Sequence, residues 1–113
     1  MRKKAMYIIG LIIAIIIFTT RNVYAITPIT PINNIYKEGI YTLDENDIGE
    51  YNLQYEFLKK DSESAIIILD KNEDIVYKNI NCNRKCNAGT ITNKNTIILI
   101  TDGEVELEFT KIK

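Results

Sequence analysis

Cys82 and Cys86, the only two cysteines of the chain, are separated by three residues in the stretch INCNRKCNAG. A close pair of this kind is typical of a disulfide across a turn, of reactive thiols, or of part of a metal site. On a straight strand the two Cα atoms would lie about 13 Å apart, whereas a disulfide needs them within roughly 7 Å. A disulfide therefore requires residues 83–85 to turn back on themselves, which Asn83 suits.

Two alternatives to a disulfide stay open from the sequence. Arg84 and Lys85 would lower the pKa of a neighbouring thiol and favour a reactive thiolate, although thioredoxin-type pairs are closer together than Cys82 and Cys86. A zinc ion would need carboxylate or water ligands besides the thiolates, because the chain has no histidine. Since a close pair in an exported protein is usually oxidised, the sequence favours a disulfide.

Other groups that do chemistry are few. The lack of histidine removes the Ser–His and Cys–His pairs of nucleophilic enzymes. Ser62 and Ser64, the only two serines, flank Glu63 in a charged segment typical of a turn, and the five glycines are scattered singly, without a phosphate-binding loop. Paired carboxylates act in glycosidases, but the acidic residues here cluster in turns, as on a solvated surface. We therefore expect no enzyme activity and no catalytic, cofactor-binding or metal-binding residues.

One segment resembles the start of an EF-hand calcium loop. Asp70, Asn72 and Asp74 reproduce the opening D-x-N-x-D of that loop. However, the sixth position, which requires glycine, is Ile75, and the twelfth, which requires a bidentate glutamate, is Asn81. Because the flanking runs are typical of strands, the segment predicts a hairpin turn with a solvated tip, and weak calcium binding is the alternative.

The first 25 residues have the layout of a secretory signal peptide. Basic residues 2–4 precede an uncharged apolar run from Ala5 to Phe18, and a polar stretch then ends at Ala25. This order predicts cleavage between Ala25 and Ile26 and a secreted, extracellular protein. The alternative is an uncleaved anchor formed by residues 5–20, although the apolar run of 14 residues is shorter than the ~20 that span a bilayer.

Composition limits the partners of the mature chain. Removing 25 of the 113 residues leaves 88, with 10 Lys or Arg against 15 Asp or Glu and hence a net charge near −5. Such a surface repels nucleic acid and anionic lipid, so we expect no nucleic-acid partner, and a membrane contact only if the first segment is retained. The abundance of Ile, Asn and Lys over Arg suggests an AT-rich genome, typical of a Gram-positive bacterium.

The elements that must position these groups read as strands. Residues 26–35 contain two Thr-Pro-Ile repeats and predict an extended lead-in, followed by a single β domain over residues 36–113. Tyr51 to Lys59 alternates with period two, as a half-buried strand does, although a helix would also gather some of its apolar side chains. Ala65–Leu69 and Thr96–Ile100 are apolar throughout and predict central strands buried on both faces.

The end of the chain predicts a hairpin. Asp102-Gly103 supplies the positive φ angles of a tight turn. It leads into a strand on which Val105, Leu107 and Phe109 face the core while the alternate glutamates, Glu104, Glu106 and Glu108, face water. Counting such runs gives six or seven strands and no helix after the signal segment. The fold class expected is all-β, a small antiparallel β-sandwich or barrel.

The segments KEGIYTL, AIIILDKNEDIVYKNI and TIILITDGEVELEF together resemble small exported β-domain proteins of clostridia, a group without an assigned activity. The resemblance covers residues 37–110 and is one of pattern: an Asp- and Asn-bearing hairpin and the last Gly-containing turn. It includes no catalytic motif and not the cysteine pair, so it implies a fold and no activity.

The sequence therefore predicts a non-catalytic β-module that acts by binding or assembly, with an unknown extracellular or cell-envelope ligand and no cofactor. Two other functions remain open. One is a thiol–disulfide or metal-responsive exported protein built on Cys82 and Cys86. The other is a membrane-anchored envelope protein whose first segment is not cleaved.

Overall fold

The computed structural model describes residues 25–113, which form seven strands and no helix. The strands are β1 (Ile26–Ile29), β2 (Asn34–Leu43), β3 (Tyr51–Phe57), β4 (Ala65–Leu69), β5 (Ile75–Ile80), β6 (Cys86–Ile91) and β7 (Thr96–Lys111). The prediction of an all-β domain with six or seven strands is confirmed. The predicted signal segment lies outside the described residues, except for Ala25 at its end.

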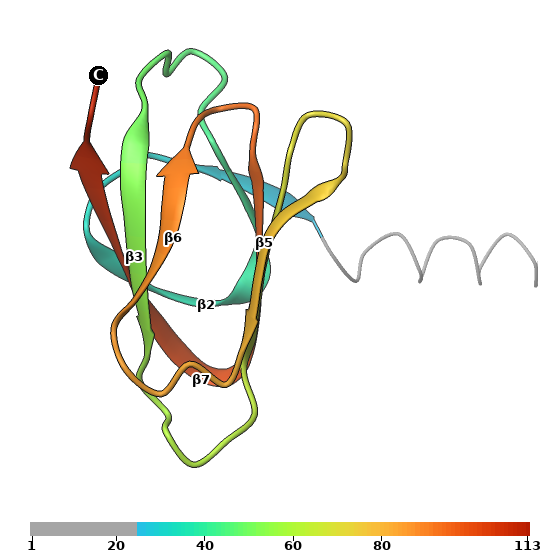
Figure 1. Cartoon of the computed structure of the whole chain (residues 1–113), viewed down its shortest axis with the longest axis vertical. Coiled ribbons are helices and arrows are strands. Elements are labelled where there is room, and N and C mark those ends of the chain that lie inside the picture. Colours follow the sequence, from blue (N-terminus) through green and yellow to red (C-terminus); the bar gives the residue numbers. More distant parts are fainter. Residues whose placement is uncertain (1–24) are drawn as a thin grey trace, which may run out of the picture.

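All seven strands belong to one open sheet built on β7 (Figure 1). β7 has β2 on one side along most of its length. On its other side it pairs first with β4, through residues 96–100, and then with β3, through residues 105–111. β5 extends the sheet beyond β4, and β6 extends it beyond β3. The long strand thereby joins two halves of the sheet.

The hairpin turn predicted at Asp102-Gly103 is wrong. β7 runs from Thr96 to Lys111 without interruption, and its odd-numbered residues face inward before and after the Asp-Gly pair. The reason is tertiary: β2 pairs with β7 on both sides of this point, at residues 96–99 and again at residues 104–107. Pairing with a strand that continues outweighs the local preference for a turn.

The sheet is mixed, so the expectation of purely antiparallel pairing is also wrong. β1 runs parallel to the last four residues of β2, with Ile26 opposite Ile40 and Ile29 opposite Leu43. A parallel pair needs a long crossover. Residues 30–39 provide it, because the first part of β2 lies against the end of β7 before the chain returns to β1. The expected lead-in, residues 26–35, thus contains β1 and the start of β2.

The strand predicted from the alternation that begins at Tyr51 is confirmed as β3, and the helical alternative is wrong. β3 supplies the two largest fully buried side chains, Tyr55 and Phe57. In β3 and in the second half of β7, every second residue is buried. The core as a whole gathers residues from five strands, among them Leu43, Leu53, Tyr55, Phe57, Ile66, Ile68, Ile91, Ile97, Leu99, Val105 and Leu107.

The two apolar runs lie in the middle of the sheet, as predicted, but they are buried on one face only. β4 lies between β5 and β7, and the first half of β7 lies between β4 and β2. In both strands buried residues alternate with half-buried or exposed ones, and Ile100 is 45% exposed. No helix or second sheet within residues 25–113 covers the outer face.

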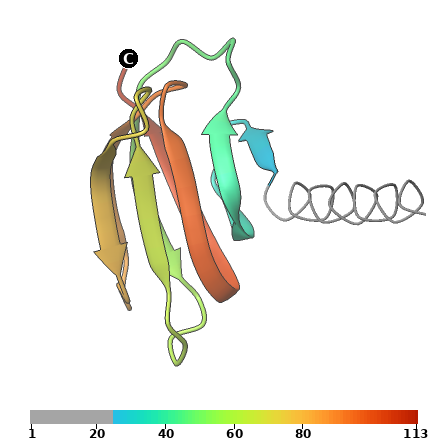
Figure 2. The same ribbon diagram turned by 90° about the vertical axis from the view of Figure 1, so that its right-hand side faces the viewer.

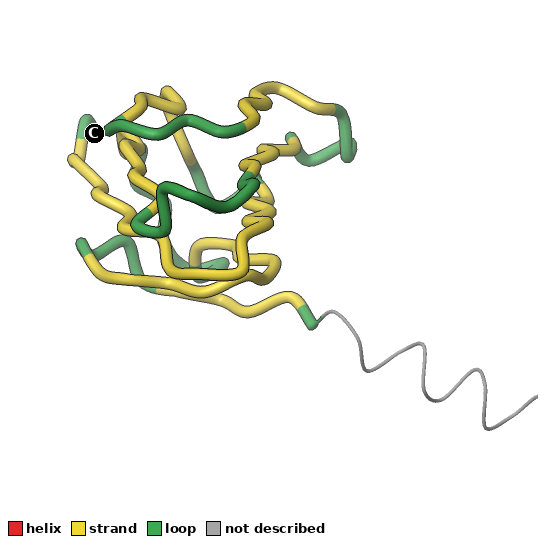
Figure 3. The backbone as a smooth tube through the Cα atoms, turned by 90° about the horizontal axis from the view of Figure 1, so that it is seen from below, coloured by secondary structure: helices red, strands yellow, loops and turns green. Residues whose placement is uncertain are grey.

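The two halves of the sheet face each other across the core. Tyr55 on β3 contacts Tyr77 on β5, with ring centroids 6.2 Å apart, although the two strands are not paired through their backbones. Seen from below, the strands surround the core (Figure 3). The strands β5 and β6 do not pair within the described residues, so the arrangement stays open and does not close into a barrel.

Candidate functional site

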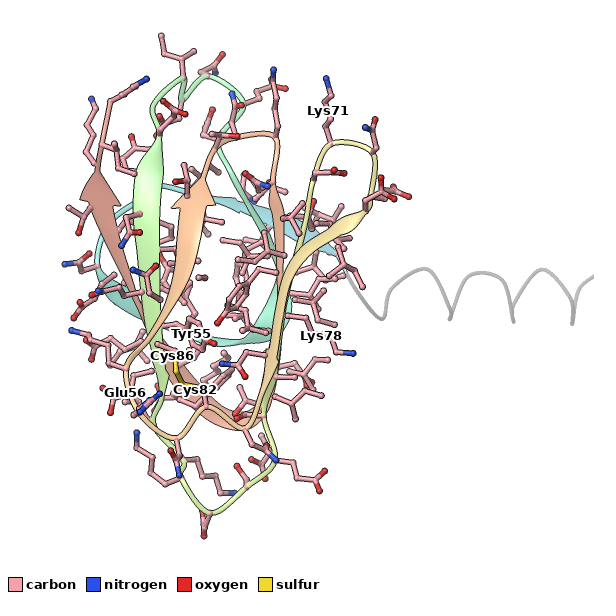
Figure 4. The ribbon with its side chains drawn as sticks, viewed as in Figure 1. Tyr55, Glu56, Lys71, Lys78, Cys82 and Cys86 are labelled. Atoms are coloured by element: carbon pink, nitrogen blue, oxygen red, sulfur yellow. A yellow bond between two sulfur atoms is a disulfide. The ribbon has the colours of Figure 1, made fainter. Side chains whose placement is uncertain are left out.

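The loop between β5 and β6 holds the two cysteines. Asn81 adopts a left-handed conformation, with φ of 56°, and turns the chain out of β5. Its backbone N–H donates to the Ser64 carbonyl at 2.7 Å, and its side-chain oxygen accepts from the Ser64 N–H at 2.8 Å. The loop then bends back so that the Cα atoms of Cys82 and Cys86 are 6.7 Å apart, at disulfide-bonding distance (Figure 4).

The surroundings of the pair do not favour a reactive thiol. Cys82 is only 7% exposed and belongs to the hydrophobic core. Lys85, expected to activate a thiolate, forms an ion pair with Glu108 at 2.6 Å. Nearby, Lys60 donates to the Asn83 carbonyl and pairs with Glu56. Two lysines around the loop therefore already have carboxylate partners, and the loop is tied to β3 and β7.

The hollow next to this loop has a volume of about 260 Å³. Cys82 and Asn81 line one side of it, and the turn after β3, residues 59–64, lines the other. Its two lysines are paired, Lys59 with Asp102 at 3.0 Å and Lys60 with Glu56 at 2.8 Å. Asp61 and Glu63 also line the hollow and form no ion pair within residues 25–113, so the hollow presents carboxylates but no free lysine.

In the turn with the EF-hand-like spacing, backbone N–H groups of the turn itself donate hydrogen bonds to the Asp70 carboxylate. Asp70 Oδ1 accepts the N–H groups of Asn72 at 2.8 Å and of Asp74 at 3.0 Å, and Glu73 has a positive φ of 65°. The predicted hairpin turn between β4 and β5 is confirmed. Within residues 25–113, no three His, Cys, Asp or Glu side chains come together as metal ligands would.

One buried polar cluster lies between the halves of the sheet. The hydroxyls of Tyr55 and Tyr77 are 2.8 Å apart, and the Asn79 amide donates to the Tyr55 hydroxyl at 3.0 Å. Burial, followed by the bond to Tyr77, raises the pKa of Tyr55. These contacts join β3 to β5 through their side chains.

The most distinctive surface is the outer side of β1, β2, β7, β4 and β5, which lie next to one another in Figure 2. Register places Ile26, Ile40, Ile98 and Ile67 in one row across four strands, with Lys78 at its end on β5. A second row holds Ile100, Ala65 and Ile80. We call this surface the isoleucine face; its apolar members are Ile26, Ile40, Ala65, Ile67, Leu69, Ile80, Ile98 and Ile100.

The isoleucine face is open to solvent and uneven. Ile26 is 60% exposed and Ile80 59% exposed at its two margins. Between β2 and β7 the face has a hollow of about 270 Å³, lined mainly by Ile40, Ile98 and Ile100. The hollow lies where β2 shifts register between Lys37 and Gly39. A shallow apolar hollow of this kind accepts an aliphatic side chain rather than a polar ligand.

Sequence reasoning missed this face. It assigned the continuous apolar runs to strands buried on both sides, whereas the outward half of each run is exposed. A chain of 113 residues has little material to cover both faces of a seven-stranded sheet, and its length is the clue that the sequence offers.

The residues named from the sequence lie apart from the isoleucine face, with one exception. Cys82 and Cys86 lie together at the end of the sheet near β3 and β6, whereas Ile26, the first residue of β1, belongs to the face and Ala25 is exposed beside it. No helix long and apolar enough to cross a membrane occurs in residues 25–113. Comparisons with protein-family models, with curated proteins and with solved structures give no match to this chain.

Proposed function

We propose that the protein is a non-catalytic, exported β-module that binds or assembles through its isoleucine face. The observation that carries this proposal is the row of four isoleucines in register, from Ile26 to Ile67, on an outer sheet face. Contiguous exposed apolar patches larger than a few hundred Å² are rare on monomeric proteins, and the largest patch on a protein is often an interaction site. The fold itself does not require them, because its core lies on the opposite side of the same strands.

Export is the second part of the proposal. The basic, apolar and polar order of residues 1–25 supports secretion with cleavage before Ile26, and the anchored form is its alternative. The cysteine pair fits this destination as a structural disulfide that closes the loop between β5 and β6. A thiol-based function ranks lower because Cys82 is buried and Lys85 is paired with Glu108.

The test uses protein recovered from the medium of the native cells, whose intact mass should begin at Ile26. This protein is immobilised and exposed to native culture medium and cell-wall extract, alongside the variants Ile98→Asp and Ile48→Asp. Ile98 lies in the middle of the isoleucine face, whereas Ile48 is 93% exposed in a loop and serves as the matched control.

Wild type and Ile48→Asp should retain the same component, and Ile98→Asp should lose it, because a buried carboxylate without a partner is costly. Circular dichroism checks that both variants keep the strand spectrum. Equal retention by all three proteins would exclude the isoleucine face as the binding surface. Recovery of the protein only from membranes, at full length, would favour the anchored form.

A further inference from the structure

The isoleucine face carries a protruding side chain and a hollow that lie in the same row. Ile80 protrudes from β5 at one margin and is opposite Ala65, which is opposite Ile100. Ile100 in turn lines the hollow between β7 and β2. One copy of the chain therefore presents both an exposed aliphatic side chain and an apolar recess of about 270 Å³. Two such faces are complementary to each other.

A positive charge lies near the protruding Ile80, and a negative charge lies at the hollow. Lys78 is the outward residue next to Ile80 on β5, and Figure 4 shows it directed away from the core. Glu38 lines the hollow on β2. Neither side chain forms an ion pair with another of the residues 25–113. Docking of Ile80 into the hollow of a second copy would bring Lys78 to Glu38.

We propose that the isoleucine face is covered by a second copy of this chain, packed face to face, with Ile80 of each copy in the hollow of the other. This inference rests on the proposed function, because it names the partner of the same face. A two-fold axis parallel to the strands, lying between β4 and β7, places β5 of one copy over β2 of the other. Rows then lie over the same rows, with the sheets about 10 Å apart, as in β-sandwiches.

Charge matching selects a second copy over a lipid surface. Two copies bring Lys78 to Glu38, whereas an acyl layer would leave both charges without a partner. β1 lies outside the overlap, so the arrangement is the same with or without the preceding segment. The overlapping area, four strands wide, is small, and a weak and concentration-dependent dimer is expected.

Zero-length cross-linking tests the geometry directly in the wild-type exported protein. Equal amounts of ¹⁴N- and ¹⁵N-labelled protein are mixed and treated with a carbodiimide, which joins a lysine amine to a carboxyl group as an amide with net loss of water. Within one copy Lys78 and Glu38 are three strand spacings apart, about 14 Å, too far for a zero-length link. The expected product is a Lys78–Glu38 peptide pair of mixed isotopic mass.

Sedimentation equilibrium then measures the dimer in wild type and three variants. Ile80→Asp removes the protruding side chain, Ile100→Asp changes the hollow, and Ile48→Asp is the control in a distant loop. The first two should each weaken the dimer at least roughly tenfold, because every dimer buries the new carboxylate twice. Ile48→Asp should leave the dissociation constant unchanged.

The outcomes separate this inference from the proposed function. A mixed-mass Lys78–Glu38 link with a dimer sensitive to both Ile80 and Ile100 supports the second copy. A protein that stays monomeric at all concentrations, yet loses a captured component in Ile98→Asp, overturns the dimer and leaves the binding function standing. A dimer that resists Ile100→Asp overturns the face-to-face geometry, since pairing through the edge of β5 would explain it. A monomer with no face-dependent capture overturns both.

Discussion

The two halves of β7 have similar apolar residues on their inner face but differ in chemical character on their outer face. Inward, the first half buries Ile97 and Leu99 and the second buries Val105 and Leu107, all at most 1% exposed. Outward, the first half presents isoleucines and the second presents glutamates. The inner side is what the fold needs, and a half with outward glutamates satisfies it equally well. The core does not require the outward isoleucines, and the proposed interaction surface would account for them.

The largest expected effect tests whether the inner faces are equivalent. Leu99→Ala in the first half and Leu107→Ala in the second should each lower the free energy of unfolding by about 2–5 kcal/mol, because both side chains are buried among core residues. Urea titration followed by circular dichroism measures both losses. If Leu99→Ala were nearly neutral, the first half of β7 would contribute little to the core and the comparison would fail.

The same strand shows what could be predicted from the sequence. In the second half, charged and apolar residues alternate, and this pattern predicts the inward positions correctly. In the first half both faces are apolar, and the alternation cannot be read. A two-residue turn at Asp102-Gly103 would have placed Ile100 on the same face as Val105, whereas a continuous strand places Leu99 there. The sequence is compatible with a turn and with a continuous strand, and pairing with β2 selects the continuous strand.

The candidate sites differ in the same way. The approach of the two cysteines was predictable, because they are close in sequence and Asn83 permits the turn between them. The isoleucine face depends on the register of five strands, and Ile26 and Ile67 are 41 residues apart in sequence. Neither the parallel pairing of β1 with β2 nor the register shift of β2 near Glu38 can be recognised from a local pattern in the sequence. The isoleucine face, on which the proposed function rests, therefore could not be predicted from the sequence, because it depends on long-range strand pairing.

A smaller effect is expected at the cysteine loop, which is tied to the glutamate half through Lys85 and Glu108. If Cys82 and Cys86 are joined, the native protein should contain no titratable thiol. Reduction should lower its stability by about 2 kcal/mol, since the bridge closes a short loop, and should leave the fold intact. Thiol titration and urea unfolding with and without reductant measure this.

The control for that experiment is the double variant Cys82→Ala/Cys86→Ala, which should behave like the reduced wild type and keep its association through the isoleucine half. Two free thiols in the native protein would contradict the structural role. A pair that cycles under mild reductant would point instead to a redox function, because structural disulfides resist such conditions.

The smallest effects separate two neighbours on the glutamate half. The hydrogen bond with Lys85 lowers the pKa of Glu108, and the hydrogen bond with Glu108, together with burial, raises the pKa of Glu106. Glu106 also lies directly opposite Glu56 on β3. A lowered pKa means that the ionised Glu108 stabilises the fold above its usual pKa. A raised pKa means that the ionised Glu106 destabilises it there.

Substitution should therefore change stability in opposite directions at neutral pH. Glu108→Gln removes the partner of Lys85 and should lower the urea midpoint, whereas Glu106→Gln removes repulsion and should raise it. At a pH well below the lowered pKa of Glu108, where both carboxyls are protonated whether the chain is folded or not, both differences should vanish. Both should also shrink in about 1 M salt, because the two side chains are reached by solvent. Effects of the same sign would mean that Lys85 does not pair with Glu108 in preference to Glu106. The cysteine loop would then not be held to β7 by this ion pair.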